Sequence, residues 1–500
     1  MELTIGDIAK ACGGRAVFTD KDAESKKVSG VYLDSRLVDK DAVFIAQKGE
    51  RSDGHSFIGQ VFEKGASLVI CEMDPEQVKV CFGTEPEKWG SYIIVEDSLI
   101  ALKRIAKAYR EKLSIPFVGI TGSVGKTSTK EFIAGVLSEK YNVLKTEGNF
   151  NNEIGVPLTL LRIRGEHELA VIEMGISDFG EMTRLTEMVQ PDIAVITNIG
   201  QCHLENLKTR DGILKAKTEI FSSLREGGRA VLFGGDDKLV TVGPVADNEP
   251  VFFGEKESVK SLAVSVSECT DNGLFGSDAV FELNYSGKGV RSGKQMDISE
   301  RLRVNVPLPG HHMVINAAAA SAVAILMELT PEEIKSGIEN MKPIAGRNNI
   351  VTVGDITLID DCYNANPVSM KSSLDLLMLA KGKKIAIMGD MFELGKNEKN
   401  MHREVGEYAA GLGIDRIYCV GELGEYISEG AREAFENGKD KNVEYIGYWK
   451  TRDDAIKGIT EDLARPAEER ELIIPGSAVL VKASHGMHFE EIVRAIREAF

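Results

Sequence analysis

The chain has 500 residues, of which 43% are hydrophobic and 27% charged, and its formal net charge is −17. This composition is typical of a soluble globular protein and excludes fibrous and low-complexity classes. The acidic balance argues against a nucleic-acid partner, because a surface that neutralises phosphates needs basic stripes. At about 100–200 residues per domain, the length predicts about three domains.

The cysteines and the apolar runs indicate the cellular compartment of the chain. Seven cysteines are scattered without a C-x-x-C pair, so neither a disulfide framework nor a structural zinc site is expected. The first residues show no basic region followed by an apolar one, and no apolar run approaches about 18 residues. We therefore expect the chain to lie in the cytoplasm with its cysteines reduced, and we expect no membrane span.

The strongest single motif is the stretch VGITGSVGKTST at residues 118–129. An apolar run ends in a glycine-containing loop, and the amphipathic pattern KTSTKEFIAGVL (126–137) follows, which predicts a strand, a phosphate-binding loop and a helix N-terminus. The pattern G-x-x-x-x-G-K-[ST] is met except at Ile120, where its first glycine would fall. The predicted ATP-binding loop is Thr121, Gly122, Ser123, Val124, Gly125, Lys126, Thr127 and Ser128.

Residues 1–112 are expected to form a small α/β domain. Short apolar runs at 31–36, 41–58 and 65–70 alternate with polar turns, and 98–113 has helical spacing. The turns carry Ser35, Arg36 and His55, which could bind an anion or could simply be solvated.

Residues 113–345 are expected to form the central domain. The short apolar runs 169–173, 193–197 and 230–233 are typical of buried parallel strands, with ligands expected at their carboxyl ends. Between 251 and 308 the residues alternate apolar and polar, which predicts an insertion of antiparallel strands. Helices are expected at 315–329 and from Thr330, the latter with Pro331 and Glu333 in its first turn.

Residues 346–500 predict a third, Rossmann-like α/β domain. Strands are expected at 357–361, 384–390, 416–421 and 477–482, with helical patterns between them. The predicted fold class is therefore α/β, with a small N-terminal domain, a central parallel-sheet ATPase-type domain that holds a phosphate loop and a β insertion, and a Rossmann-like C-terminal domain.

Further motifs along the whole chain resemble the Mur ligases. They are TEGNFNNEIGVPLTLL (146–161), EMG (173–175), NIGQCHLE (198–205), LKAKTEIF (214–221), PGHHMVINAAAA (309–320), AGR (345–347), DDCYNANPVSM (360–370), MGDMFELG (388–395) and VKASHGM (481–487). The resemblance implies an ATP-dependent ligase of peptidoglycan precursor synthesis. ATP would phosphorylate a carboxylate of UDP-N-acetylmuramoyl-tripeptide, and the amine of D-Ala-D-Ala would attack the acyl phosphate.

The resemblance also implies a role for each matched residue. Lys126, Lys217, His203 and Glu173 match catalytic positions, and Lys217 matches a lysine that this family carbamylates. The metal set would be Thr127, Glu173, His203 and the carbamate of Lys217, holding two Mg²⁺ ions. Taken singly, each of these residues could be an ordinary surface or turn residue, and their order along the chain favours function.

Contacts with ATP and with the other substrates are implied in the same way. Beyond the loop, the ATP contacts would be Asn316, Arg347, Asp361, Tyr363 and Asn364. The substrate contacts would be Ser35, Arg36, Asn149, Asn151, Asn152 and Asn366. Two positions depart from the family pattern: Met313 stands where asparagine is usual, and His485 stands where the usual K-G-S-R has arginine.

Other functions remain to be weighed. The Mur ligase that adds the third amino acid carries a D-N-P-R motif that is absent here, and a folate polyglutamylating ligase would lack the nucleotide-sugar domain implied by residues 1–112. A nucleotide-dependent switch would use the loop but would leave Glu173, His203 and Lys217 without a role. We expect a monomer whose third domain closes over ATP and brings Asp361 and Asn364 to it.

Overall fold

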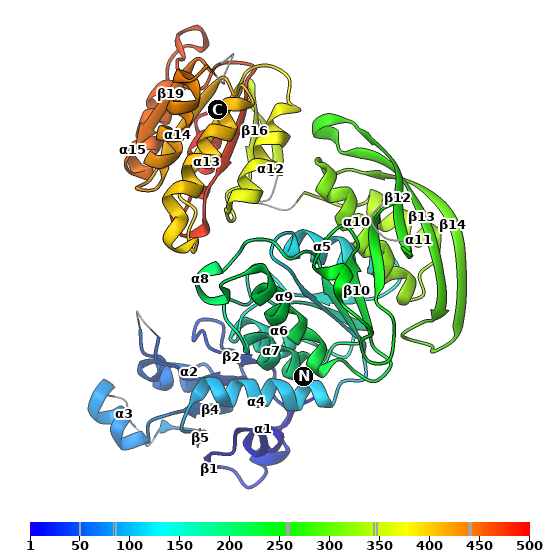
Figure 1. The fold of residues 1–500 in the computed structure, drawn as a ribbon. Coiled ribbons are helices and arrows are strands. Elements are labelled where there is room, and N and C mark those ends of the chain that lie inside the picture. The colour runs from blue at the N-terminus through cyan, green and yellow to red at the C-terminus, as the bar shows by residue number, and fades with distance from the viewer. Residues whose placement is uncertain are drawn as a thin grey trace.

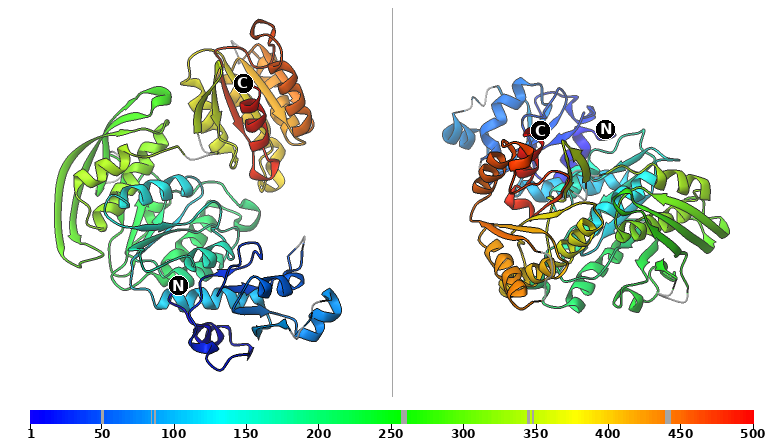
Figure 2. Two further views of the ribbon diagram at one scale, coloured as in Figure 1. Left: turned by 180° about the vertical axis from the view of Figure 1, so that it is seen from behind. Right: turned by 90° about the horizontal axis from the view of Figure 1, so that it is seen from above.

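The computed structural model describes residues 1–49, 52–83, 85, 88–256, 261–343, 346, 349–438 and 443–500. Its strands form three sheets, of five, nine and six strands, which follow one another along the chain. Figure 1 shows the first domain below the central one and the third above it, and Figure 2 gives the same arrangement from behind and from above. The predicted α/β class and its three-part architecture are confirmed.

The first sheet has the order β1-β5-β4-β3-β2, in which only the β1–β5 pair is antiparallel. Its strands are β1 (Arg15–Val17), β2 (Val31–Tyr32), β3 (Val43–Ile45), β4 (Leu68–Cys71) and β5 (Ser91–Ile94). The helices are α1 (Ile5–Cys12), α2 (Ile58–Glu63), α3 (Pro75–Phe82) and α4 (Ser98–Glu111). Helix α4 begins after Asp97, whose side chain accepts the Ile100 N–H, and it leads into the central domain.

The central sheet has the order β14-β13-β12-β11-β10-β9-β6-β8-β7. Its strands are β6 (Phe117–Thr121), β7 (Val143–Lys145), β8 (Leu169–Glu173), β9 (Ile193–Ile196), β10 (Arg229–Phe233), β11 (Val251–Glu255), β12 (Val264–Asp271), β13 (Ser277–Lys288) and β14 (Gln295–Val306). The helices are α5 (Lys126–Leu137), α6 (Gly155–Leu160), α7 (Glu181–Val189), α8 (Leu204–Leu207), α9 (Arg210–Thr218), α10 (His311–Leu326) and α11 (Pro331–Glu339). Helix α11 has the expected first turn, with a capping box between Thr330 and Glu333.

The predicted β insertion continues the central sheet. Strands β11 and β12 run parallel to their inner neighbours, and only the β12–β13 and β13–β14 pairs are antiparallel. Helix α10 packs against both β11 and β12, so these two strands remain covered like the strands before them. The helix begins at His311, earlier than predicted, because Gly310 has a φ of 95° and turns the chain into it.

The third sheet has the order β15-β16-β20-β17-β18-β19, with β15 antiparallel and the other pairs parallel. Its strands are β15 (Asn349–Val353), β16 (Ile356–Asp360), β17 (Lys384–Gly389), β18 (Arg416–Val420), β19 (Tyr445–Trp449) and β20 (Ala478–Lys482). The helices are α12 (Pro367–Met378), α13 (Glu398–Gly411), α14 (Gly424–Glu436), α15 (Arg452–Leu463) and α16 (Glu490–Glu498).

The first and central domains share one apolar core. A single cluster of buried side chains runs from Leu3 to Leu239 and includes residues of α1, α4, β6 and α7. The third domain has two clusters of its own, and Leu274 of the central domain adds a partly buried side chain to one of them. Within the described residues, none of the helices has the length and apolar character that a membrane crossing requires.

Candidate active site

The candidate site lies at the carboxyl edge of the central sheet, where β6, β8 and β9 end. A cavity of about 1180 Å³ opens there and is lined by both the central and the third domain. Sixteen of the predicted residues line it: Ser123, Val124, Gly125, Lys126, Thr127, Ser128, Asn149, Asn151, Asn152, Glu173, His203, Asn316, Asp361, Tyr363, Asn364 and Asn366. Parallel strands bring these distant segments together, because their carboxyl ends meet at one edge.

The phosphate loop is held by the residues that follow β9. The side chain of Asn198 accepts the Val124 N–H at 3.0 Å and donates to the Val124 carbonyl at 2.9 Å, and Thr197 donates to the same carbonyl at 2.7 Å. At Gly122, with a φ of 155°, a Cβ atom would lie 1.9 Å from the Thr197 hydroxyl. The loop therefore requires glycine there, and it delivers the chain to the N-terminus of α5, a favourable place for phosphate.

Two lysines converge on one carbonyl of this loop. Lys126 Nζ donates to the Gly122 oxygen at 2.8 Å, and Lys217 Nζ donates to the same oxygen at 3.0 Å. Burial of Lys217, which is 1% exposed, and the nearby ammonium of Lys126 lower the pKa of Lys217 to about 7. A large fraction of Lys217 is therefore a neutral, nucleophilic amine at neutral pH.

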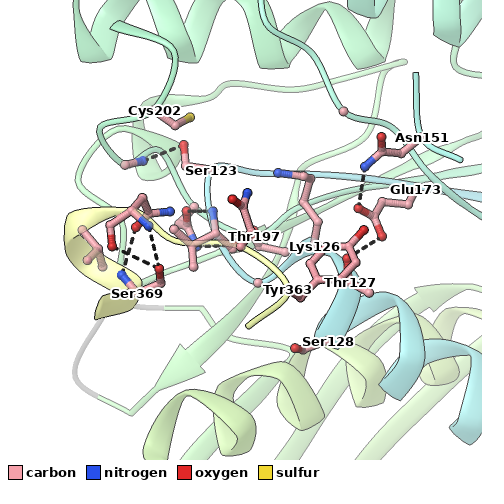
Figure 3. Close-up of a pocket in the computed structure, with 18 of the residues that line it drawn as sticks. Ser123, Lys126, Thr127, Ser128, Asn151, Glu173, Thr197, Cys202, Tyr363 and Ser369 are labelled. Carbon is pink, nitrogen blue, oxygen red and sulfur yellow. Dashed lines mark hydrogen bonds between the residues drawn. The ribbon is translucent and has the colours of Figure 1, made fainter. Parts of the chain in front are cut away.

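Glu173 ends β8 inside the cavity and is 2% exposed. One of its carboxylate oxygens accepts the Thr127 hydroxyl at 2.8 Å and the other accepts the Asn151 amide at 2.9 Å, as Figure 3 shows. Carboxylate and hydroxyl oxygens are ligands that suit Mg²⁺, so Thr127 and Glu173 fit one such ion.

His203 contacts a residue of the third domain. Its Nδ1 lies 3.1 Å from a carboxylate oxygen of Glu393, which belongs to the third domain, and this contact lowers the pKa of Glu393. Both residues have positive φ angles, 50° at His203 and 63° at Glu393. Thr127 and Glu173 contact each other, Lys217 contacts the phosphate loop, and His203 contacts Glu393. Among the described residues, no group of three His, Cys, Asp or Glu side chains is arranged for a metal ion.

Asn316 and the asparagines after β7 take defined positions. Asn316, on α10, accepts the Thr129 hydroxyl at 3.0 Å and places its amide 3.7 Å from the sulfur of Met313. The departure at Met313 is therefore part of the environment of Asn316. Asn152 accepts the Ile154 and Gly155 N–H groups at the start of α6, and Asn149 is exposed in the same loop.

In the third domain, a buried ion pair joins Asp361 to Lys482 at the cavity wall. Lys482 Nζ lies 2.5 Å from Asp361 and also donates to the Asn364 carbonyl at 3.0 Å. The centre of the Tyr363 ring lies 5.7 Å from the centre of the His485 imidazole ring. Asn366 forms a capping box at the start of α12, so its side-chain oxygen is used by the helix. Arg347 lies outside the described residues.

Ser35 and Arg36 do not line the cavity and lie in the first domain, after β2. Arg36 is paired with Asp34 at 2.6 Å, and the Ser35 carbonyl accepts Lys64 Nζ at 2.8 Å. Thr121 is fully buried at the end of β6, under the loop.

The structure adds site residues that sequence reasoning missed. Lys482 is one, and Lys130, a buried lysine that lies 3.8 Å from Glu173, is another. The signal for Lys130 was its spacing of one helical turn after Lys126, which places the two on the same side of α5.

Three family models match this chain in succession. The Mur ligase family catalytic domain matches residues 27–110, the Mur ligase middle domain 120–324, and the Mur ligase glutamate ligase domain 346–485. The chain therefore belongs to the Mur ligase family.

Within that family, the chain is similar to ligases named for D-alanyl-D-alanine. The UDP-N-acetylmuramoyl-tripeptide–D-alanyl-D-alanine ligase of Bacillus subtilis is 34% identical, over 100% of this chain and 99% of the relative. The ligase of the same name from Escherichia coli is 32% identical, over 94% of both chains.

Solved structures agree with the sequence relatives. A crystal structure of MurF from Acinetobacter baumannii superimposes with a TM-score of 0.81 at 28% identity, covering 99% of both chains. MurF from Thermotoga maritima, solved in complex with ADP, has a TM-score of 0.74 at 27% identity, covering 94% of this chain and 97% of that one.

Proposed function

We infer that this chain is an ATP-dependent ligase that joins D-alanyl-D-alanine to UDP-N-acetylmuramoyl-tripeptide. One observation carries the inference: a single cavity joins the phosphate loop, the Glu173 carboxylate and the polar residues of the third domain. The chain also matches relatives of that name over 99% and 94% of their length. A phosphate loop with an acceptor domain facing it suits a transfer from ATP to a second bound substrate.

The reaction has two balanced steps. A carboxylate oxygen of the tripeptide attacks the γ-phosphorus of ATP, the bond to the β-phosphate oxygen breaks, and ADP leaves. The free amine of D-Ala-D-Ala then attacks the acyl carbon, an amide bond forms, and phosphate leaves with the transferred carboxylate oxygen while the amine loses a proton. The protein must orient both attacks and keep water from the acyl phosphate.

Lys126 is proposed to bind the transferring phosphoryl group at the N-terminus of α5, where its charge stabilises developing negative charge. Lys217 is proposed to be carbamylated. Its neutral amine attacks carbon dioxide, a C–N bond forms and one proton is released. The carbamate places a negative charge beside Lys126, and it removes the repulsion between Lys126 and the charged fraction of Lys217, which share one carbonyl.

Mg²⁺, held by Thr127 and Glu173, would neutralise charge on the phosphate oxygens of ATP. His203 and the carbamate are proposed to serve a second ion. The Nδ1 atom of His203 faces Glu393 of the third domain and leaves Nε2 for an ion, so we propose that ion binding and the position of the third domain are linked.

The remaining assignments concern substrates and domains. Ser35 and Arg36 are proposed to bind the UDP portion in a first domain of residues 1–112, and Asn149, Asn151, Asn152 and Asn366 to bind the peptide portion. We propose that ATP lies between a central domain of 113–345 and a third domain of 346–500. Its proposed contacts are Asn316, Arg347, Asp361, Tyr363 and Asn364. Since residues of a single chain line the cavity, we propose that the monomer is sufficient for the reaction. The cytoplasmic location remains a prediction.

Release of ADP tests this function. Purified protein is incubated with Mg²⁺-ATP and UDP-N-acetylmuramoyl-tripeptide, with and without D-Ala-D-Ala. We expect sustained ADP release only when both acceptor substrates are present, together with the pentapeptide product. Equal release without either substrate would instead indicate an ATPase or a nucleotide-dependent switch.

A further inference from the structure

Lys130 is a buried lysine for which the proposed reaction has no direct use. It lies in the interior of α5, one helical turn after Lys126, and it is 1% exposed. An ammonium group so deeply buried must be compensated by hydrogen bonds and by negative charge. Its Nζ donates to the Thr146 carbonyl at 2.7 Å and lies 3.0 Å from Glu131 and 3.8 Å from Glu173.

These contacts join three segments that each carry candidate site residues. Helix α5 carries Lys126 and Thr127, the loop that begins at Thr146 carries the asparagines, and β8 ends at Glu173. The loop and β8 are bonded to each other as well, because the Thr146 hydroxyl accepts the Glu173 N–H at 3.0 Å. Lys130 therefore reaches from the helix to a loop and a strand end that already contact each other.

The charges around Lys130 explain why the group is a lysine and not an apolar side chain. Glu173 receives neutral hydrogen bonds from Thr127 and Asn151, and Lys130 brings a positive charge to the same buried carboxylate. Glu131 also faces Lys130, but it forms a second ion pair with the half-exposed Lys145. Lys130 therefore lies between two carboxylates, and Lys145 gives Glu131 a second cation from the outside, so the Lys130 charge is shared between Glu131 and Glu173.

We propose that Lys130 is a positioning residue, which holds the Glu173 carboxylate and the loop of residues 146–152 against α5 so that they form one unit with the phosphate loop. The assignment rests on the proposed function for its consequence in catalysis. The anchoring itself is a property of the ligand-free protein. Without the ammonium group, the loop loses its bond to α5 and Glu173 loses its buried cation.

Lys130→Met tests the proposal, because methionine has a similar length and no charge. Hydrogen exchange is followed in the ligand-free protein, without metal or ATP. We expect exchange of the amides in 146–152 to become at least about tenfold faster, while peptides from the first and third domains are unchanged. In the ligation assay we expect kcat/KM for the UDP-tripeptide to fall about 100-fold and KM for D-Ala-D-Ala to stay within about threefold.

Lys145→Met is the matched control, since it removes the other cation beside Glu131, and the Lys145 ammonium group pairs with Glu131 and not with the Thr146 carbonyl or Glu173. It should leave exchange in 146–152 and both kinetic constants within about threefold of the unchanged protein. If Lys130→Met yields no folded protein, Lys130→Gln replaces it, because glutamine is polar but carries no charge and is shorter, so it should also speed exchange in 146–152.

Three results would overturn the proposal. They are wild-type exchange in 146–152 of the folded Lys130→Met or Lys130→Gln protein, a uniform rise of exchange across the central domain, and an equal effect of Lys145→Met. If the unsubstituted protein joins no substrates while the exchange results hold, the proposed function fails and the positioning role stands.

Discussion

The two joints of this molecule differ in how they are built. The joint between the first and central domains is a continuous apolar core around α4, and Arg110 reaches through it with no exposed surface. The described contacts between the central and third domains are local, such as His203–Glu393 and the side chain of Leu274. We infer from this difference that the first and central domains form a fixed half, which holds the phosphate loop, and we predict that the third domain can move.

The largest expected effect comes from the fixed half. Lys217→Ala should lower kcat about 1000-fold, because it removes the proposed carbamate beside Lys126. Acetate or formate should restore part of the activity by placing a carboxylate in the space that the side chain leaves. The matched control is Lys215→Ala, an exposed lysine on the same helix, and it should remain within about threefold. Full activity of Lys217→Ala would remove the carbamate from the account.

Breaking the fixed joint should cost stability. Arg110 donates to the Val189 and Gln190 carbonyls at 2.7 and 2.9 Å, and its guanidinium lies 3.8 Å from the centre of the Phe117 ring. Arg110→Met leaves those buried carbonyls without their donor, so we expect the free energy of unfolding to fall by about 3 kcal/mol.

Urea denaturation measures that change. Arg104→Met, an exposed arginine on the same helix, should change the free energy by less than about 0.5 kcal/mol. An Arg110 variant as stable as the unsubstituted protein would show that the joint does not depend on this residue.

Because the third domain has its own apolar clusters, we expect its stability to depend on pH through a buried group of its own, Asp390. Burial raises the pKa of Asp390, at the N-terminus of α14, to about 6 from an ordinary value of 3.8. Because the folded pKa is raised, its stabilising contribution is full below about pH 4 and is lost as pH rises through about 6. Between pH 5 and pH 7 we expect the third domain to lose about 1 kcal/mol from this group.

Tryptophan fluorescence can follow each half, since Trp449 lies in β19 and Trp89 in the first domain. In a Trp89→Phe background, the urea midpoint should be higher at pH 5 than at pH 7, by more than in the same protein with Asp390→Asn. An equal pH dependence with and without Asp390→Asn would contradict the assignment.

The smallest expected effect is at the movable joint. Glu393→Ala removes the contact between the exposed Glu393 carboxylate and the His203 imidazole, so kcat should change by no more than about threefold, while X-ray scattering should give a larger radius of gyration without ligands. Glu490→Ala is the control, because His488–Glu490 has the same 3.1 Å separation within the third domain. An ATP analogue with the UDP-substrate should shrink both proteins, and scattering unchanged by these ligands would contradict closure.

Much of this architecture could be predicted from the sequence, because buried parallel strands are short apolar runs with polar ends. Strand β8 and helix α5 fall on the predicted residues, and Thr330 caps α11 as expected. Strands β15 and β19 were missed: β19 contains Gly447 and two tyrosines, and its pattern is weakly apolar. The direction of β11 and β12 was also missed, since periodicity reports exposure and does not report the pairing of strands.

Less of the site could be predicted. Motif order placed the phosphate loop and Glu173 together, but it gave no sign that Lys126 and Lys217 share one carbonyl or that His203 pairs with Glu393. Those are consequences of packing between distant segments. Burial is equally hard to read from a charged residue, and Lys130, which is 1% exposed, was not singled out from the sequence.

The most direct test of the account follows an oxygen atom. The terminal carboxylate of the UDP-tripeptide is labelled with ¹⁸O, and the phosphate released during ligation is analysed by mass spectrometry. If the carboxylate attacks the γ-phosphorus of ATP, one labelled oxygen must appear in each phosphate released. Phosphate without the label, formed while the amide product accumulates, would contradict the acyl phosphate and with it the proposed use of the cavity.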